Sequence, residues 1–171
     1  NPFPETEWIA ILNQIEAKAK ARLKLPTWFA ANNIVFPSKI SVEQTSSEKT
    51  AAHKASLISG GSLIDLTGGF GVDDFYFAQK IKKVVHCEIN PELSQIAQHN
   101  FEQLKVKNIS CHSGDSLDIL KKLNTKWDWI YIDPSRRNDA KGKVFMLEDC
   151  LPNVPVHLDL LFQHSDSILI K

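Results

Sequence analysis

Short apolar runs alternate with amphipathic segments from residue 62 to the end of the chain. The runs are SLIDLT at 62–67, KVVHCEI at 83–89, NISCHS at 108–113, WDWIYID at 127–133 and SILIK at 167–171. Helical patterns between them predict helices over about 72–80, 91–104, 116–123 and 154–162. Nearly continuous apolar strands are typical of a parallel sheet that is covered by helices on both faces. The pattern therefore predicts an α/β fold with a doubly wound, mostly parallel sheet.

The first part of the chain follows a different pattern. Apolar residues recur at helical spacing between Glu5 and Leu25 and predict an amphipathic helix that Pro26 ends. Its apolar stripe is expected to consist of Trp8, Ile11, Leu12, Ile15, Ala19 and Leu23. The opposite face carries Lys18, Lys20, Arg22 and Lys24. We favour a solvated face over an RNA-contacting ridge for these basic residues.

An irregular stretch follows, and a second helix is expected to start within TSSEKT. Thr45 and Glu48 stand at capping-box spacing there, and Gly60 and Gly61 can end the helix. We therefore divide the chain into an N-terminal helical extension, residues 1–44, and a core domain, residues 45–171.

Composition narrows the class of protein. The 171 residues have 43% hydrophobic content and a formal net charge of zero, so the chain shows no strongly basic footprint of an autonomous nucleic-acid binder, although a separate domain could supply one. Cys87, Cys111 and Cys150 lack CxxC spacing and indicate reduced thiols, with no metal site expected. No apolar stretch reaches bilayer length. We expect a cytoplasmic protein with no membrane partner.

The strands end in acids. Asp65, Glu88 and Asp133 end the first, second and fourth strands, and Asp115 closely follows the third. Ligands of such sheets bind beyond the carboxyl ends of the strands. After the first strand, glycines 68, 69 and 71 allow a sharp turn that a ligand can approach closely.

A nicotinamide dinucleotide would also fit such a turn, but its fingerprint needs glycine where Asp74 stands. Asp73 and Asp74 at the mouth of the following helix are expected to repel a pyrophosphate. The alternative for these two acids, and for Ser116, is that they cap helices.

Four motifs in order, DLTGGFG, EIN, GDS and DPS, resemble those of class I S-adenosylmethionine-dependent methyltransferases, over residues 62–171. The resemblance implies a Rossmann-like methyltransferase fold and S-adenosyl-L-methionine as cofactor. It implies that Asp65 reaches the methionine amino group, that Gly69 and Gly71 line the methionine, and that Thr67 and Gly68 belong to the same turn. It further implies that Glu88 accepts the ribose hydroxyls, that Asp115 accepts from the adenine amino group, and that Ile89 and Ser116 flank the adenine.

The fourth strand delivers YIDPSRR. In amine methyltransferases this position carries Asp or Asn, two prolines and an aromatic residue. An amino group becomes nucleophilic when it donates hydrogen bonds to a carboxylate and a carbonyl, for which Asp133 and the carbonyl of Pro134 are the candidates.

The motif departs from that family pattern in its second half. Ser135 replaces the second proline and Arg136 the aromatic residue. Arg136 and Arg137 could grip a phosphate or stack on a base. Alternatively, Arg137 pairs with Asp139 or Glu148 and orders the loop.

The whole arrangement resembles bacterial RNA methyltransferases with a THUMP-like C-terminal domain. That resemblance implies a fragment whose RNA partner, tRNA or rRNA, binds through a domain outside it, and whose fifth strand is an exposed edge. Thr67 in place of a family glycine is shared with some ribosomal RNA guanine-N2 methyltransferases, which favours guanine N2 as acceptor. Gln44, Ser46, Ser47 and Thr50 are candidates to touch cofactor or substrate, or the two serines only begin a helix.

Two other functions stay open. A nicotinamide-dependent oxidoreductase is disfavoured by Asp74 and by the absence of a placed Tyr-Lys or His pair. A methyltransferase-like binding module that has lost catalysis is suggested only by DPSRR in place of the usual motif.

Overall fold

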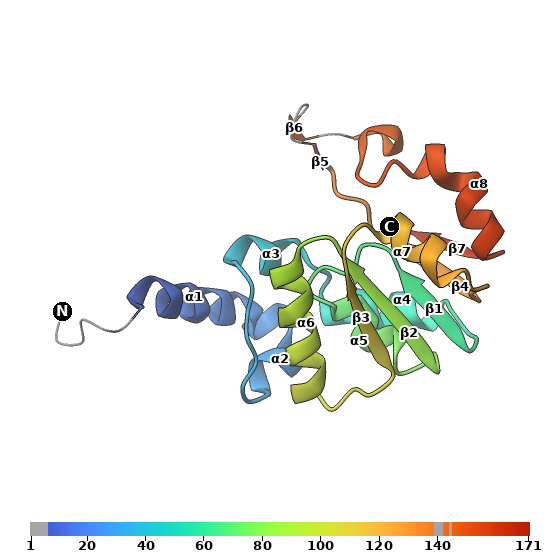
Figure 1. The fold of residues 1–171 in the computed structure, drawn as a ribbon. Helices are drawn as coiled ribbons and strands as arrows, with labels where there is room; N and C mark the ends of the chain where they lie inside the picture. Colours follow the sequence, from blue (N-terminus) through green and yellow to red (C-terminus); the bar gives the residue numbers. More distant parts are fainter. Residues whose placement is uncertain (1–6, 139–141, 144) are drawn as a thin grey trace.

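Five parallel strands form the central sheet of the computed structural model, which describes residues 7–138, 142–143 and 145–171 (Figure 1). The strands are β1 (Ser62–Asp65), β2 (Lys83–Glu88), β3 (Ile109–Ser113), β4 (Trp129–Ile132) and β7 (Ile168–Ile170). Their order is β3-β2-β1-β4-β7. The chain thus runs outward from β1 in one direction and then from β4 in the other, which confirms the predicted doubly wound sheet. This order places the topological switch point between β1 and β4.

Helices cover both faces of this sheet. Helices α7 (Ser116–Leu123) and α8 (Val154–His164) pack on one face, in a core cluster that includes Ile64, Val85 and Ile130. Helices α4 (Glu48–Ser56) and α5 (Val72–Phe77) cover the other face, over Leu63 and Val84. Neighbouring residues of a strand thus enter opposite cores, as the pleat requires. Helix α6 (Pro91–Gln103) packs against β2 and β3.

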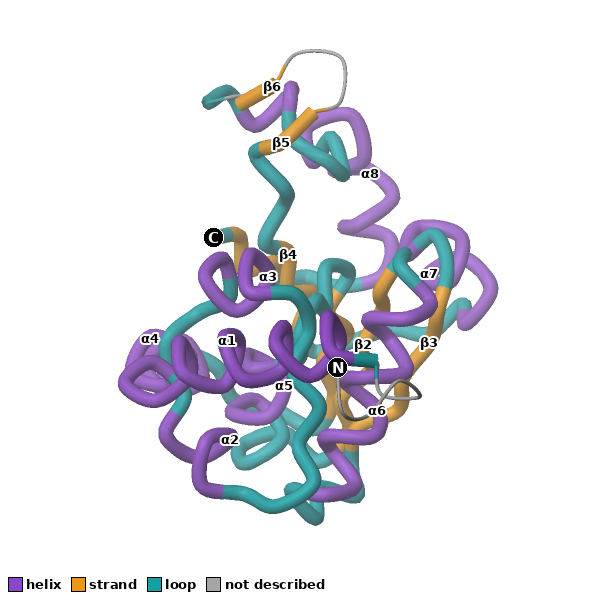
Figure 2. The backbone as a smooth tube through the Cα atoms, turned by 90° about the vertical axis from the view of Figure 1, so that its left-hand side faces the viewer, coloured by secondary structure: helices purple, strands orange, loops and turns teal. Residues whose placement is uncertain are grey.

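The segment between β4 and α8 contains elements that the sequence did not predict. It forms a short hairpin, β5 (Arg137–Asn138) and β6 (Gly142–Lys143), and a 3-10 turn, η1 (Leu147–Asp149). Figure 2 shows this hairpin standing away from the sheet. No helix in the described part of the chain is long and apolar enough to span a bilayer.

The N-terminal extension consists of α1 (Trp8–Lys24), α2 (Pro26–Ala30) and α3 (Lys39–Gln44). The predicted apolar stripe of α1 does not face the core: Ile15 is 59% exposed and Leu23 is 93% exposed. The buried residues of this helix are Ala17 and Ala21. Small side chains let α1 approach its neighbours closely, so contact follows the alanines and not the largest apolar residues.

The basic face of α1 is partly engaged by α3. The Lys24 ammonium donates hydrogen bonds to the carbonyls of Val42, at 3.1 Å, and Glu43, at 2.6 Å. Lys20 forms an ion pair with the Glu43 carboxylate at 3.2 Å. These two lysines therefore bind the C-terminal end of α3. Lys18, Lys20 and Arg22 are exposed, which agrees with the solvated face that we favoured.

The extension shares a core with the glycine turn. Trp28 and Val42 belong to the same buried cluster as Phe70 and Val72, which flank Gly71. The Glu48 carboxylate adds polar ties, since it accepts hydrogen bonds from the backbone N–H and the hydroxyl of Thr27 and from the Tyr76 hydroxyl. The described part of the N-terminal extension, residues 7–44, therefore packs against the glycine turn and supports it.

Candidate active site

Two cavities line the carboxyl ends of the strands. The smaller has a volume of about 410 Å³ and the larger about 1040 Å³. Both are lined by Thr67, Glu88, Asp133 and Ser135, so they adjoin. Ile89, Asp115 and Ser116 line the smaller cavity, and Gly68, Gly69, Pro134 and Arg136 line the larger. Of the residues that the four motifs assign to the cofactor or the acceptor, Asp65 and Gly71 line neither cavity.

The glycine turn is fixed by packing behind it. Gly69 and Gly71 have φ angles of 57° and 80°, a left-handed region that favours glycine. A Cβ atom on Gly68 would lie 2.2 Å from the imidazole of His86, and one on Gly71 would lie 2.4 Å from the ring of Phe101. These two glycines are therefore required by the neighbouring strand and helix, independently of any ligand.

Asp65 lies behind Thr67. The Asp65 carboxylate is 1% exposed and accepts hydrogen bonds from the Thr67 backbone N–H at 2.7 Å and from its hydroxyl at 3.1 Å. The same hydroxyl accepts a hydrogen bond from the Asp133 backbone N–H at 2.7 Å. Burial above all, and then the charge of Asp74, raise the pKa of Asp65 well above its ordinary value. The Thr67 hydroxyl thus links Asp65, at the end of the first strand, to the backbone of Asp133, at the end of the fourth. The contact of Asp65 with a methionine ammonium stays a prediction.

The two acids that follow the turn are each paired, and Asp74 is buried whereas Asp73 lines the larger cavity. Asp74 and His86 are both fully buried, and the carboxylate lies 2.6 Å from the imidazole Nδ1. Asp73 forms an ion pair with Lys54 at 2.5 Å. Neither acid caps α5, whose N-cap is Gly71. The expected repulsion of a pyrophosphate by these two acids is therefore not supported, because Asp74 is fully buried and Lys54 compensates the charge of Asp73.

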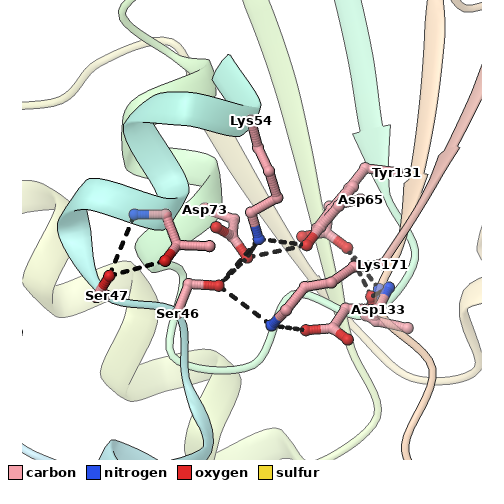
Figure 3. A network of polar contacts seen from close by, with 10 residues as sticks. Ser46, Ser47, Lys54, Asp65, Asp73, Tyr131, Asp133 and Lys171 are labelled. Atoms are coloured by element: carbon pink, nitrogen blue, oxygen red, sulfur yellow. Dashed lines mark hydrogen bonds and ion pairs between the residues drawn. The ribbon is translucent and has the colours of Figure 1, made fainter. Parts of the chain in front are cut away.

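Lys54 is the centre of a polar network that the sequence analysis missed (Figure 3). Its ammonium donates to the Tyr131 hydroxyl at 2.7 Å and to the Ser46 hydroxyl at 2.9 Å. The hydroxyls of Tyr131 and Ser46 each donate to Asp73 at 3.0 Å. Burial lowers the pKa of Lys54, and Asp73 opposes that shift. One signal in the sequence could have indicated that Lys54 is buried: its helical spacing places it on the same face of α4 as Ala51 and Ala55, which are buried with it.

The four polar residues before β1 that were candidates to touch cofactor or substrate fall into two groups. Gln44 and Ser46 line the larger cavity, whereas Ser47 and Thr50 do not. Ser47 is the N-cap of α4 and accepts from the Thr50 N–H at 3.1 Å. The capping box predicted from Thr45 is therefore wrong. The helix-start alternative holds for Ser47 only.

Glu88 and Asp115 hold backbone groups at the rim of the smaller cavity. The Glu88 carboxylate accepts hydrogen bonds from the backbone N–H of Gly69 and of Asn90, each at 2.8 Å. Asp115 caps α7 by accepting from the N–H of Leu117 at 2.9 Å. Ser116 therefore does not cap that helix.

The end of β4 brings the first four residues of DPSRR, Asp133 to Arg136, to the larger cavity. The Asp133 carboxylate forms an ion pair with the Lys171 ammonium at 2.7 Å. Ser135 exchanges two backbone hydrogen bonds with Leu151, at 2.8 and 3.1 Å, which fixes the loop after the motif. Arg136 is exposed. The side chain of Arg137 and the whole of Asp139 lie outside the described residues, so the suggested pairing of Arg137 stays a prediction.

The smaller cavity fits an adenosine. Leu66, Ile89 and Leu117 give it apolar walls, and Glu88 and Asp115 give it carboxylate acceptors for hydroxyl and amino hydrogens. No lysine or arginine is among the described residues that line it, so it lacks the cations that phosphates attract. These apolar walls and carboxylate acceptors therefore fit the adenosine part of S-adenosylmethionine.

Strand order, glycine turn and the row of strand-end acids together define a Rossmann-like methyltransferase fold. A protein of Porphyromonas gingivalis W83, provisionally named a methyltransferase, matches it with a TM-score of 0.79 and 33% identity, over 94% of this chain and 40% of that protein. An uncharacterized RNA methyltransferase of Mycoplasma mobile is 27% identical over 159 residues, which are 90% of this chain and 44% of that protein.

A tRNA methyltransferase of M. jannaschii shares the fold alone, with a TM-score of 0.51 and 14% identity over 69% of this chain and 32% of that protein. No protein-family model matches the chain. The chain spans about two fifths of the length of the first two relatives.

Proposed function

We propose that this chain is the catalytic core of an S-adenosylmethionine-dependent methyltransferase that modifies a base nitrogen of RNA. The observation that carries the proposal is the position of Asp133, which lies where the smaller cavity adjoins the larger one. The names of the Mycoplasma mobile and Porphyromonas gingivalis relatives support a methyltransferase, and that of the former supports RNA.

The cofactor would lie across both cavities. Glu88 would accept the ribose hydroxyls and Asp115 the adenine amino hydrogens, in addition to the backbone groups that they hold. The methionine part would lie against Gly68 and Gly69 in the larger cavity. Asp65, which Thr67 screens, would act on the ammonium through water.

S-adenosylmethionine, when bound, supplies a methyl group activated by a sulfonium. Asp133 and the carbonyl of Pro134 would accept the hydrogens of the acceptor amine and direct its lone pair at that methyl group. The nitrogen forms the new bond to carbon, the carbon–sulfur bond breaks with its electron pair on sulfur, and the amine proton then leaves to Asp133 or water. No strong base is needed, so alignment supplies most of the rate.

We further propose guanine N2 as the acceptor and tRNA or rRNA as the substrate, bound with the help of a domain outside these 171 residues. The Thr67 variant of the turn supports the acceptor. Arg136, at the rim of the larger cavity, is the residue that would grip a phosphate or stack on a base.

The test uses full-length protein, tritiated S-adenosylmethionine and total RNA from cells that lack the gene. Wild type should transfer label to RNA, and D133N should lower the rate by about 100-fold or more, because a group aligned with the reacting atoms is lost. D118N is the matched control, since Asp118 is an exposed residue of α7 that lines neither cavity.

Calorimetry separates the alternatives. Binding of NADH without binding of S-adenosylhomocysteine would indicate the oxidoreductase, and binding of S-adenosylhomocysteine without any transfer would indicate the inactive binding module. Nucleoside mass spectrometry of RNA from the deletion strain should show loss of N2-methylguanosine. Loss of a different methylated nucleoside would refute guanine N2 and leave the methyltransferase in place.

A further inference from the structure

Lys171 is placed beside Asp133 by the register of the sheet. Strands β4 and β7 are parallel, and Ile132 pairs with Ile170. The next residues along the two strands are Asp133 and Lys171, and the Lys171 backbone N–H donates to the Ile132 carbonyl at 3.1 Å. The backbone therefore brings these two side chains to the same edge of the sheet.

The Lys171 side chain bridges two walls of the larger cavity. Its ammonium lies 2.7 Å from Oδ2 of Asp133 and 3.3 Å from the hydroxyl of Ser46 (Figure 3). Ser46 belongs to the segment before β1 and is 5% exposed. Its hydroxyl also accepts from Lys54 and donates to Asp73. Lys171 thus ties the Asp133 carboxylate to a rigid, buried network on the opposite wall.

Stability does not explain this pair. The side chains of Lys171 and Asp133 are 35% and 34% exposed, and an ion pair at such exposure contributes only about 0–1 kcal/mol to folding. The pair nevertheless engages the carboxylate on which the proposed chemistry depends. The pair also acts on Lys54: burial is the main cause that lowers the pKa of Lys54, Lys171 adds to that shift, and Asp133 opposes it.

We propose that Lys171 is a positioning residue for methyl transfer. Its ammonium holds Asp133 by Oδ2, so that the carboxylate is fixed in one orientation and Oδ1 accepts the hydrogen of the acceptor amine. This inference rests on the proposed function. An unheld aspartate would rotate about its side-chain bonds, and a misplacement of about 1 Å at a reacting group can cost about 100-fold in rate.

The experiment compares K171M, K171R and K126M in full-length protein. Methionine keeps the length of the side chain without its charge, and arginine keeps the charge. Lys126 pairs with Asp166 at 3.5 Å on the exposed surface and lines neither cavity, so K126M is the matched control. Each variant is assayed for kcat with total RNA from cells that lack the gene, for the Kd of S-adenosylhomocysteine, and for Tm.

K171M should lower kcat by about 10- to 100-fold, with the Kd of S-adenosylhomocysteine changed by less than about threefold and Tm unchanged. K171R should recover much of the rate, and K126M should equal wild type. A K171M enzyme that keeps its kcat while wild type is active would overturn this inference alone. A loss of S-adenosylhomocysteine binding in proportion to the rate would also overturn it, because Lys171 would then hold the cofactor. Absence of transfer by wild type would refute the proposed function and, with it, this role.

Discussion

Replacing Gly68 by alanine tests whether the glycine turn is held by packing from behind. The new Cβ would lie 2.2 Å from both Cε1 and Nδ1 of His86 and 2.8 Å from its Cγ. The imidazole has little freedom to move away, because it is fully buried, lies 2.6 Å from the Asp74 carboxylate and packs edge-on to Phe101 with a centroid separation of 5.8 Å. Either the turn or the ring must therefore shift.

The cost has two parts. Overpacking of a well-packed site costs about 1–3 kcal/mol. Displacing the imidazole weakens its hydrogen bond to a buried carboxylate, which contributes a further 1.5–3 kcal/mol or so. We expect G68A to lower the free energy of unfolding by roughly 3 kcal/mol or more, and therefore to lower Tm by about 10 °C in a chain of this size.

Thermal and urea unfolding measure this effect, with G61A as the matched control. Gly61 lies in a loop where a Cβ would come no closer than 3.4 Å to the Asp128 carboxylate, so G61A should lose little. The double variant G68A/H86A should be more stable than the sum of its single variants predicts, because the clash is absent. Equal Tm values for G68A and G61A would refute the packing argument.

Two further predictions concern the acids behind the turn. T67V removes the acceptor of the Asp133 backbone N–H and should cost about 1–3 kcal/mol in urea unfolding, whereas T67S keeps the hydroxyl and should cost less; equal losses would show that the hydroxyl bridge is unimportant. Asp65 has a folded-state pKa well above 3.8, so the folded chain retains a proton that the unfolded chain releases above that pH, and stability falls as pH rises through this window. The free energy of unfolding of D65N, relative to that of wild type, should therefore be higher at pH 8 than at pH 5. A difference in unfolding free energy that does not change with pH would contradict the raised pKa of Asp65.

Strands and their terminal acids could be predicted because they depend on local pattern. A parallel sheet brings the carboxyl ends of its strands to one edge. Assigning the strands was therefore enough to predict that Asp115 and Asp133 lie at the same site, and both line the smaller cavity. The predicted glycine turn is present, but packing gives a second reason for its glycines that the motif does not show. Gly68 is fixed by His86, a residue 18 positions away along the chain, and that contact leaves no trace in the spacing of the motif.

The network beside Asp133 could not be predicted because it is tertiary. Lys54 and Tyr131 are 77 residues apart in sequence, and their hydrogen bond exists only because α4 and β4 contribute to the same core cluster. The prediction of the contact face of α1 was wrong for a related reason. Hydrophobicity points to the largest side chains, whereas close helix packing selected Ala17 and Ala21.

The misread face of α1 has a practical consequence for handling the protein. Ile9, Leu12 and Ile15 are 78%, 56% and 59% exposed on a helix that extends beyond the body of the molecule (Figure 1). Each Å² of apolar surface that two copies bury against each other is favourable by about 25 cal/mol, so we expect this exposed stripe to favour association at the concentrations used for crystallisation. Glutamate at positions 12 and 15 would raise colloidal stability while the alanine contact stays intact. The same stripe gives a crystallographer two surface sites to vary without touching the cavities.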